Sequence, residues 1–200
     1  KLKLSICWIL LFVGILIIFT SGCFFLKNLS YSTNWGFITK YFSKINYIFN
    51  SSIKGIEESD LILLVGTNPR KEAAIINARI RKRSLQGNFK IAYVGPNLDK
   101  STQFGLNYPI NHLGKTAETI SQIASGKHKF SSELAQASNP IIIIGSNVLV
   151  RDDSSTLISM LSQIDANLRL VKGRTQSVLS IIQPNASQYG AVQLGLDSFN

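Results

Sequence analysis

Cysteine is nearly absent from this 200-residue chain. Its only two cysteines, Cys7 and Cys23, lie near the beginning, and none occurs from Phe24 to Asn200. Disulfide frameworks, cysteine-ligated zinc sites and iron–sulfur clusters all need cysteine sulfur, so the sequence excludes them from the region after Cys23. The two histidines, His112 and His128, lie in polar stretches without metal-ligand spacing. We therefore predict no metal site.

Charge is absent from the segment Ser5 to Leu26, which is rich in Ile, Leu and Phe and is flanked by lysines. About 20 apolar residues in a helix span a bilayer core. We therefore expect residues 1–27 to form an apolar helix that acts as a membrane anchor or a targeting segment. Thr20-Ser21-Gly22-Cys23 resembles a lipoprotein cleavage box, so a cleaved signal stays open, as does a segment foreign to the domain. Residues 28–50 show no clear period and are predicted to be a linker.

Acidic residues are scarce, with 11 Asp and Glu against 21 Lys and Arg and a formal net charge of +10. Such a surplus can attract nucleic acid or an acidic membrane face. However, no zinc finger or RNA-recognition motif is present, and aromatic residues do not interleave with the basic ones. We therefore predict no nucleic-acid partner and interpret one basic helix as a docking face. The residues of this predicted docking face are Arg79, Arg81, Lys82 and Arg83.

Apolar runs after residue 50 are short and separated by helical patterns. Leu61–Val65, Phe89–Val94 and Ile141–Ile144 are predicted strands, the first and third of them apolar throughout, as expected where helices cover both faces of a sheet. Strands separated by helices imply crossover connections and a parallel sheet. Residues 51–200 are therefore predicted to form an α/β domain with a Rossmann-like, doubly wound parallel sheet.

The remaining elements follow from apolar spacing and from capping residues. Lys100–Leu113 is predicted to be a loop, and Val178–Ile182 reads as either helix or strand. Asp152 and Asp153 follow a strand and could bind a metal, but they are predicted to cap the next helix, because carboxylates favour a helix N-terminus. Ser131 is the predicted cap of another helix. Helices are predicted at residues 52–58, 72–83, 115–124, 131–137 and 154–167.

The glycine-rich signatures GxGxxG and GxxxxGK[ST] are missing, and so is a nucleophile elbow. Turns that contain Gly and Asn follow each predicted strand instead, where open α/β sheets bind ligands. Backbone amides in such turns can hold phosphate, but any tight strand-to-helix turn uses the same residues. The sequence leaves both readings open and predicts no catalytic residue. The candidate pocket residues are Gly66, Thr67, Asn68, Pro69, Gly95 and Gly145.

Ordered blocks of sequence from about residue 46 to residue 195 resemble a known family. They begin with Asn46–Ile53, Gly55–Asp60, Leu63–Arg70 and Asn77–Lys82, and they continue through Val94-Gly95, His112–Gly114, Ile123–Gly126, Pro140–Ser146, Arg151–Asp153, Ala186–Gln188 and Leu194-Gly195. In these blocks the chain resembles the large iron–sulfur subunit of respiratory NADH dehydrogenase (complex I). That subunit is called subunit 11 in some protist mitochondrial genomes, and it has a bacterial counterpart. The match covers part of that subunit's C-terminal, molybdopterin-oxidoreductase-like region.

The resemblance implies a place in a complex and not a reaction. It implies a structural or accessory part of NADH:ubiquinone oxidoreductase that supports electron transfer from NADH to quinone without a cofactor or catalytic residues of its own. The turn at Gly66–Pro69, with Gly95 and Gly145, then becomes a vestigial pocket. Iron–sulfur clusters and FMN are expected in partner subunits or in a missing N-terminal region. The expected partners are the iron–sulfur N-terminal half and the flavin subunit.

The resemblance also implies a location on the matrix side of the mitochondrial inner membrane, or on the cytoplasmic side of a bacterial inner membrane. Membrane association is expected through the complex or through the N-terminal segment. That segment has no counterpart in the family, and the chain stops before the family's region ends, so we expect a fragment or a split-gene product. Two alternatives stay open: a molybdopterin- or nucleotide-binding oxidoreductase fragment, and a membrane-anchored binding module.

Overall fold

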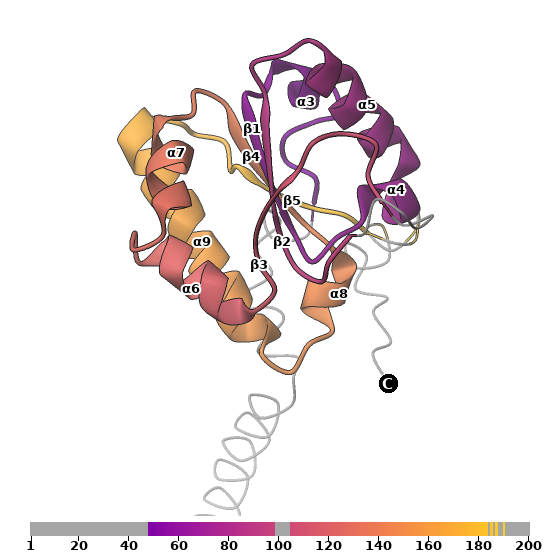
Figure 1. Cartoon of the computed structure of the whole chain (residues 1–200). Coiled ribbons are helices and arrows are strands. Elements are labelled where there is room, and N and C mark those ends of the chain that lie inside the picture. The colour runs from indigo at the N-terminus through magenta and orange to yellow at the C-terminus, as the bar shows by residue number, and fades with distance from the viewer. Residues whose placement is uncertain (1–47, 99–104, 184, 186, 188–189, 191–200) are drawn as a thin grey trace, which may run out of the picture. The chain divides into compact units, whose positions relative to one another are not determined.

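The computed structural model describes residues 48–98, 105–183, 185, 187 and 190 (Figure 1). The predicted apolar segment at residues 1–27 and nearly all of the predicted linker lie outside these residues. Among the helices of the described ranges, none combines the length and the apolar character needed to cross a bilayer.

The described residues contain a five-stranded parallel sheet, which confirms the predicted α/β class. The strands follow one another in space in the order β3-β2-β1-β4-β5. This matches the first five strands of the doubly wound dinucleotide-binding sheet, in which the strand order reverses between β1 and β4. The strands are β1 (Leu61–Val65), β2 (Lys90–Val94), β3 (Asn111–Gly114), β4 (Pro140–Ile144) and β5 (Leu179–Ile181).

Two strands differ from the sequence prediction. β3 falls mostly within the predicted loop Lys100–Leu113, because its sequence Asn-His-Leu-Gly has no apolar strand pattern and only pairing with β2 makes it a strand. β5 resolves the ambiguous stretch Val178–Ile182 as a strand. Its backbone pairs with β4 and all three of its residues are buried. In both places pairing with a neighbouring strand determines the conformation, and the local sequence pattern gives no indication of that pairing.

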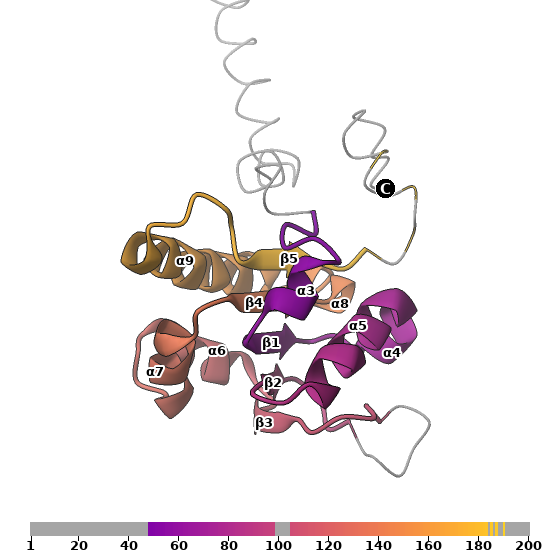
Figure 2. The ribbon, with the colours of Figure 1, turned by 90° about the horizontal axis from the view of Figure 1, so that it is seen from above.

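Helices cover both faces of the sheet (Figures 1 and 2). On one face lie α3 (Gly55–Glu58), α4 (Pro69–Glu72) and α5 (Ala74–Leu85). On the other lie α6 (Ala117–Ala124), α7 (Lys129–Gln136) and α9 (Ser154–Lys172), while the short α8 (Ser146–Leu149) follows β4 directly. The doubly wound arrangement is therefore present, and α8 is an element that the sequence did not predict.

Three departures of helix boundaries or caps from the prediction have a local structural cause. The predicted helix at residues 72–83 is broken at Ala73, whose φ of −151° and ψ of 76° are not helical. Helix α7 is capped by His128, whose ring nitrogen accepts the Phe130 N–H at 3.1 Å, and not by Ser131, which donates instead to the Ile123 carbonyl. Helix α9 runs past residue 167 and ends at Gly173, which has the left-handed φ of 61° that favours glycine.

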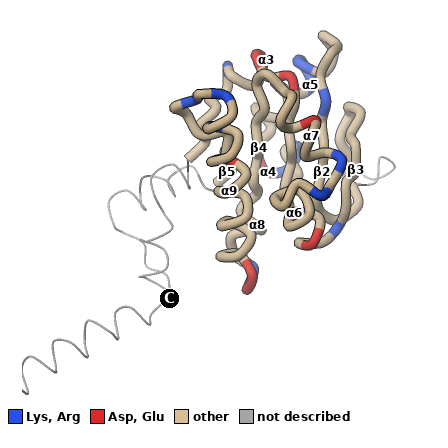
Figure 3. The backbone as a smooth tube through the Cα atoms, turned by 90° about the vertical axis from the view of Figure 1, so that its left-hand side faces the viewer, with Lys and Arg blue, Asp and Glu red and all other residues tan. Residues whose placement is uncertain are grey.

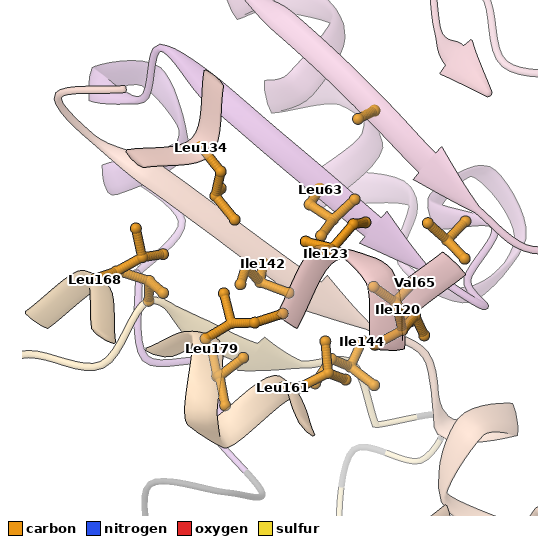
Figure 4. Close-up of a cluster of buried hydrophobic side chains, with 14 of the residues drawn as sticks. Leu63, Val65, Ile120, Ile123, Leu134, Ile142, Ile144, Leu161, Leu168 and Leu179 are labelled. Carbon is orange, nitrogen blue, oxygen red and sulfur yellow. The ribbon is translucent and has the colours of Figure 1, made fainter. Parts of the chain in front are cut away.

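The core lies on both faces of the central strands. Leu63 and Val65 of β1 face α6, α7 and α9, and Figure 4 shows Leu63 near Ile142 and Val65 near Ile144 of β4. The intervening residues Ile62 and Leu64 point to the opposite face, where they meet the side chains of α3 and α5. All five residues of β1 are buried because both of its faces are covered, which explains its uninterrupted apolar sequence.

Candidate functional site

The predicted pocket residues gather at the carboxyl ends of three adjacent strands. Val65 pairs with Val94 on one side and with Ile144 on the other, so the turns that follow β1, β2 and β4 lie side by side. Gly66, Gly95 and Gly145 are therefore neighbours, as the sequence predicted. This edge includes the switch point at which doubly wound sheets bind their ligands.

The amides of these three glycines already have acceptors. Gly66 donates to the Val94 carbonyl at 2.9 Å, and Gly145 donates to the Val65 carbonyl at 3.0 Å. Gly95 donates to the Gly114 carbonyl at 2.9 Å. Each bond extends the ladder between neighbouring strands by one residue. The glycines thus lengthen the sheet, and their N–H groups do not point outward as a phosphate cradle requires.

Asn68 and Pro69 form the beginning of α4. The Asn68 side chain accepts the Arg70 N–H at 3.2 Å, and its own backbone N–H donates to Glu72 at 2.7 Å. Pro69 occupies the first turn, where its missing N–H costs nothing. The Arg70 guanidinium donates to the Gly105 carbonyl at 2.8 Å, so it holds a neighbouring segment of chain. The Asn68–Glu72 turn is therefore a closed capping arrangement.

Side chains of this protein fill the space beside each glycine. A Cβ on Gly66 would lie 2.5 Å from Cγ2 of Val148, and a Cβ on Gly95 would lie 2.5 Å from the Tyr93 hydroxyl. A Cβ on Gly145 would lie 2.6 Å from the Gly66 carbonyl oxygen and 2.8 Å from Cβ of Thr67. These glycines allow close packing of the protein against itself. Thr67 is 1% exposed, and its hydroxyl has no hydrogen-bond partner in the described chain.

A cavity of about 250 Å³ remains at this edge. Its polar lining comes from Lys115 and Thr116 before α6, from Asn147 and from Arg151. Pockets for drug-sized ligands occupy about 300–1,000 Å³, and a pterin or dinucleotide cofactor is at least that large. Such a group would share this edge with Val148, which packs against Gly66. We therefore assign no chemical step to it.

Arg151 at the rim of the cavity is held by a carboxylate. Its Nε and Nη2 lie 2.6 and 2.8 Å from the two oxygens of Asp153. The hydrogen bond to Arg151 lowers the pKa of Asp153, and the same bond raises the pKa of Arg151. Asp153 stands at the N-cap position of α9, but its carboxylate makes no capping hydrogen bond. The predicted N-cap position is thus confirmed for Asp153, but its carboxylate bonds to Arg151, two residues earlier, and not to the helix amides.

Metal-ligating side chains do not cluster in the part of the chain that the structure describes. No group of three or more His, Cys, Asp or Glu residues lies there with a geometry that could hold an ion. His112 is on β3, with Nε2 2.8 Å from the Gly95 carbonyl. His128 caps α7. Each histidine therefore has a local structural contact.

The predicted docking face divides into two kinds of residue. Arg79 and Lys82 both pair with Glu57 on α3, and hydrogen bonds from Lys82 and then Arg79 lower the pKa of Glu57. Arg83 donates to the carbonyls of Ser59 and Gly87 and lies over the Phe89 ring. Within the described ranges, Arg81 is exposed and makes no hydrogen bond or ion pair. Three of the four predicted docking residues therefore have partners inside the domain.

Sequence reasoning missed the residues that pack beside two of the glycines, Val148 and Tyr93. Val148 lies in the unpredicted α8, three residues after Gly145, and Tyr93 lies inside a strand. Neither position carries a local signal, since an apolar residue in a strand or helix reads as ordinary core. Their approach to Gly66 and Gly95 depends on how α8 and β2 lie across the sheet edge.

Comparison with known proteins identifies relatives of this chain by sequence. The chain is 43% identical over 150 residues to the mitochondrial NADH dehydrogenase [ubiquinone] iron-sulfur protein 1 of Solanum tuberosum, covering 75% of this chain and 19% of that protein. It is 39% identical over 153 residues to the NADH-ubiquinone oxidoreductase 75 kDa subunit of Reclinomonas americana, covering 76% and 21%. It is 33% identical over 153 residues to a subunit of the NADH-quinone oxidoreductase of Rickettsia bellii, also covering 76% and 21%.

These relatives confirm the predicted resemblance to the large subunit of complex I. The chain spans about a fifth of the length of the curated relatives it matches. A family model described as molybdopterin oxidoreductase matches residues 23–200. Because that match takes in most of the sequence, the chain belongs to the molybdopterin oxidoreductase family.

Proposed function

We propose that this chain is a structural part of NADH:ubiquinone oxidoreductase that holds no cofactor of its own. It would contribute to the peripheral part of the enzyme and support electron transfer from NADH to quinone through cofactors bound elsewhere. The proposal places it on the matrix side of the mitochondrial inner membrane, or on the cytoplasmic face of a bacterial inner membrane. Its partners would be the iron–sulfur and flavin-bearing parts of that enzyme.

The packing of Val148 against Gly66 is the observation that carries the proposal. In this contact Val148 packs beside the turn after β1, at the switch point where members of doubly wound folds bind ligands. The amides of Gly66, Gly95 and Gly145 are also used within the sheet, so they are not available to a phosphate. Four relatives named as subunits of NADH dehydrogenases supply the functional context, each matched over about 75% of this chain.

Native purification of the full chain from its source membranes tests the proposal. We expect NADH dehydrogenase activity, flavin and iron–sulfur subunits to co-purify with the chain after solubilisation in mild detergent. Isolation of the chain as a stable monomer, with no trace of those subunits, would overturn it. Determining the mature N-terminus in the same preparation shows whether the apolar segment at residues 1–27 is retained.

A molybdopterin- or nucleotide-binding enzyme fragment is the second candidate, favoured by the family match and by the strand order. It requires Val148 and Tyr93 to leave the positions that they occupy beside the two glycines. Elemental analysis for molybdenum and mass spectrometry for pterin or nucleotide separate the two candidates. A stoichiometric amount of either group in purified chain would favour the second, and none would favour the first.

A further inference from the structure

Helix α5 exposes apolar side chains on the side that faces away from the sheet. Ile75 is 67% exposed and Leu85 is 80% exposed, although Ile80 on the opposite side is fully buried. Ile75, Ala78 and Leu85 recur at helical spacing and share one side of the helix with Lys82. A surface helix usually presents polar residues to water there. The outer side of α5 is therefore apolar beyond what the packing of this domain requires.

Basic residues border this apolar side. By helical spacing Arg79 and Arg81 flank it, and Lys82 lies within it. Figure 3 shows basic residues along α5. Arg79 and Lys82 share a single carboxylate, that of Glu57. This carboxylate balances one of the three positive charges of Arg79, Arg81 and Lys82. Since Glu57 fixes two of the cations, their side chains lose little further freedom on contact with a partner. The surface combines exposed apolar groups with a local positive charge.

The chemistry of this surface selects among possible partners. Nucleic acid is bound through phosphate contacts and stacking aromatic residues, and α5 has no aromatic residue. A membrane-surface helix inserts a continuous apolar face, whereas Ile75 and Leu85 are separated by about 15 Å along the helix. Two separated apolar contacts with cations around them match a protein interface, which has an apolar centre and a charged rim.

A second exposed apolar pair provides a contrast. Leu170 and Val171 on α9 are 82% and 74% exposed. The nearby Lys172 and Arg174 donate to backbone carbonyls at residues 137 and 138, so their charges stabilise the turn before β4. The surface around Leu170 and Val171 therefore has exposed apolar side chains, but its cations Lys172 and Arg174 already have partners in the described chain, in contrast to Arg81 on α5. It is a matched control of similar exposure.

We propose that the outer side of α5, formed by Ile75, Ala78, Arg81, Lys82 and Leu85, docks onto an acidic protein surface of the respiratory complex. The inference rests on the proposed function and names the face through which the chain joins its partners. The partner surface presents one or more apolar side chains between Asp or Glu carboxylates. Opposite charge steers the encounter, and burial of Ile75 and Leu85 supplies the short-range affinity.

The test compares variants of the full chain by co-purification with flavin and iron–sulfur subunits. One variant carries Ile75→Ser and Leu85→Ser, and a second carries Arg81→Glu. We expect both to associate at least about tenfold more weakly than the parent, a loss of about 1.4 kcal/mol or more in binding free energy. A control with Leu170→Ser and Val171→Ser should associate like the parent.

The possible results distinguish failure of the proposed function from failure of the inference about α5. If the parent chain never associates with the complex, the proposed function and this inference fall together. If the parent associates and the α5 variants associate equally well, the inference alone falls. Selective loss of binding to phosphatidylserine vesicles or to RNA, with association with the complex unchanged, also overturns it in favour of that ligand. Circular dichroism melting of every variant confirms that the domain is folded before binding is compared.

Discussion

Gly66 and Val148 provide the sharpest test of the closed pocket. In Gly66→Ala the new methyl would lie 2.5 Å from Cγ2 of Val148, at a residue whose φ is +57°. The left-handed backbone costs an L-residue about 1–2 kcal/mol, and overpacking costs about 1–3 kcal/mol more. We therefore expect Gly66→Ala to reduce the free energy of unfolding by about 2–5 kcal/mol.

Two further variants separate the contributions. Gly173→Ala has nearly the same φ, +61°, with no atom within 4 Å of the new methyl, so it should show the backbone cost alone. Val148→Ala removes two buried methyl carbons and should cost about 1–3 kcal/mol. In the Gly66→Ala/Val148→Ala double variant the steric conflict is gone. Its loss should therefore be smaller than the sum of the two single losses by about 1–3 kcal/mol.

Urea denaturation of the full chain in mild detergent, followed by circular dichroism, measures these free energies. The midpoint should change while the denaturant slope stays constant, as expected for a change in stability alone. Strict additivity of the two substitutions would refute the reasoning, because it would mean that Val148 does not press on the Gly66 turn. The same result would weaken the assignment of a closed pocket.

Further predictions concern a buried carboxylate and two titrating groups. Asp165→Ala should cost about 2–4 kcal/mol in urea denaturation, because the buried carboxylate accepts the Val178 N–H at 2.7 Å; Asp165→Asn should cost less, since it retains an acceptor. Burial raises the pKa of Tyr93 to about 12. The free energy of unfolding should therefore decrease from about pH 10 to about pH 12, because the Tyr93 hydroxyl loses its proton first in the unfolded state. Tyr93→Phe should show a smaller decrease in that range. The hydrogen bonds from Lys82 and Arg79 lower the pKa of Glu57. Their contribution to stability is therefore present above the pKa of unfolded Glu and is lost as the pH decreases through the lower pKa of the folded state. Glu57→Gln should make the melting temperature depend less on pH in the acidic range.

Local pattern was enough to predict the central part of the fold. The apolar sequences of β1 and β4 and the basic helix between β1 and β2 are visible in the sequence because burial on both faces and helical spacing are properties of neighbouring residues. The edges were not predictable in this way. Asn111–Gly114 has no strand pattern and becomes a strand through pairing with β2.

The candidate site divides in the same way. Its position was predictable, because glycine turns after parallel strands meet at one edge of the sheet. Its closure was not, because the Val148 side chain reaches Gly66 across two strand ends. The docking face was predictable as a basic cluster, but the pairing of Arg79 and Lys82 with Glu57 depends on how α3 lies against α5.

The sequence by itself determined that this is a parallel α/β domain of the molybdopterin oxidoreductase family, without cysteine ligands after Cys23. Composition and residue spacing carry that information because they express burial and covalent chemistry along the chain. Tertiary structure alone decided that the glycine turns are filled by Val148 and Tyr93 and that α5 presents Ile75 and Leu85 outward. The reason is physical: Gly66 and Val148 are distant in sequence and meet only through packing, and the exposure of a side chain depends on which elements pack over it.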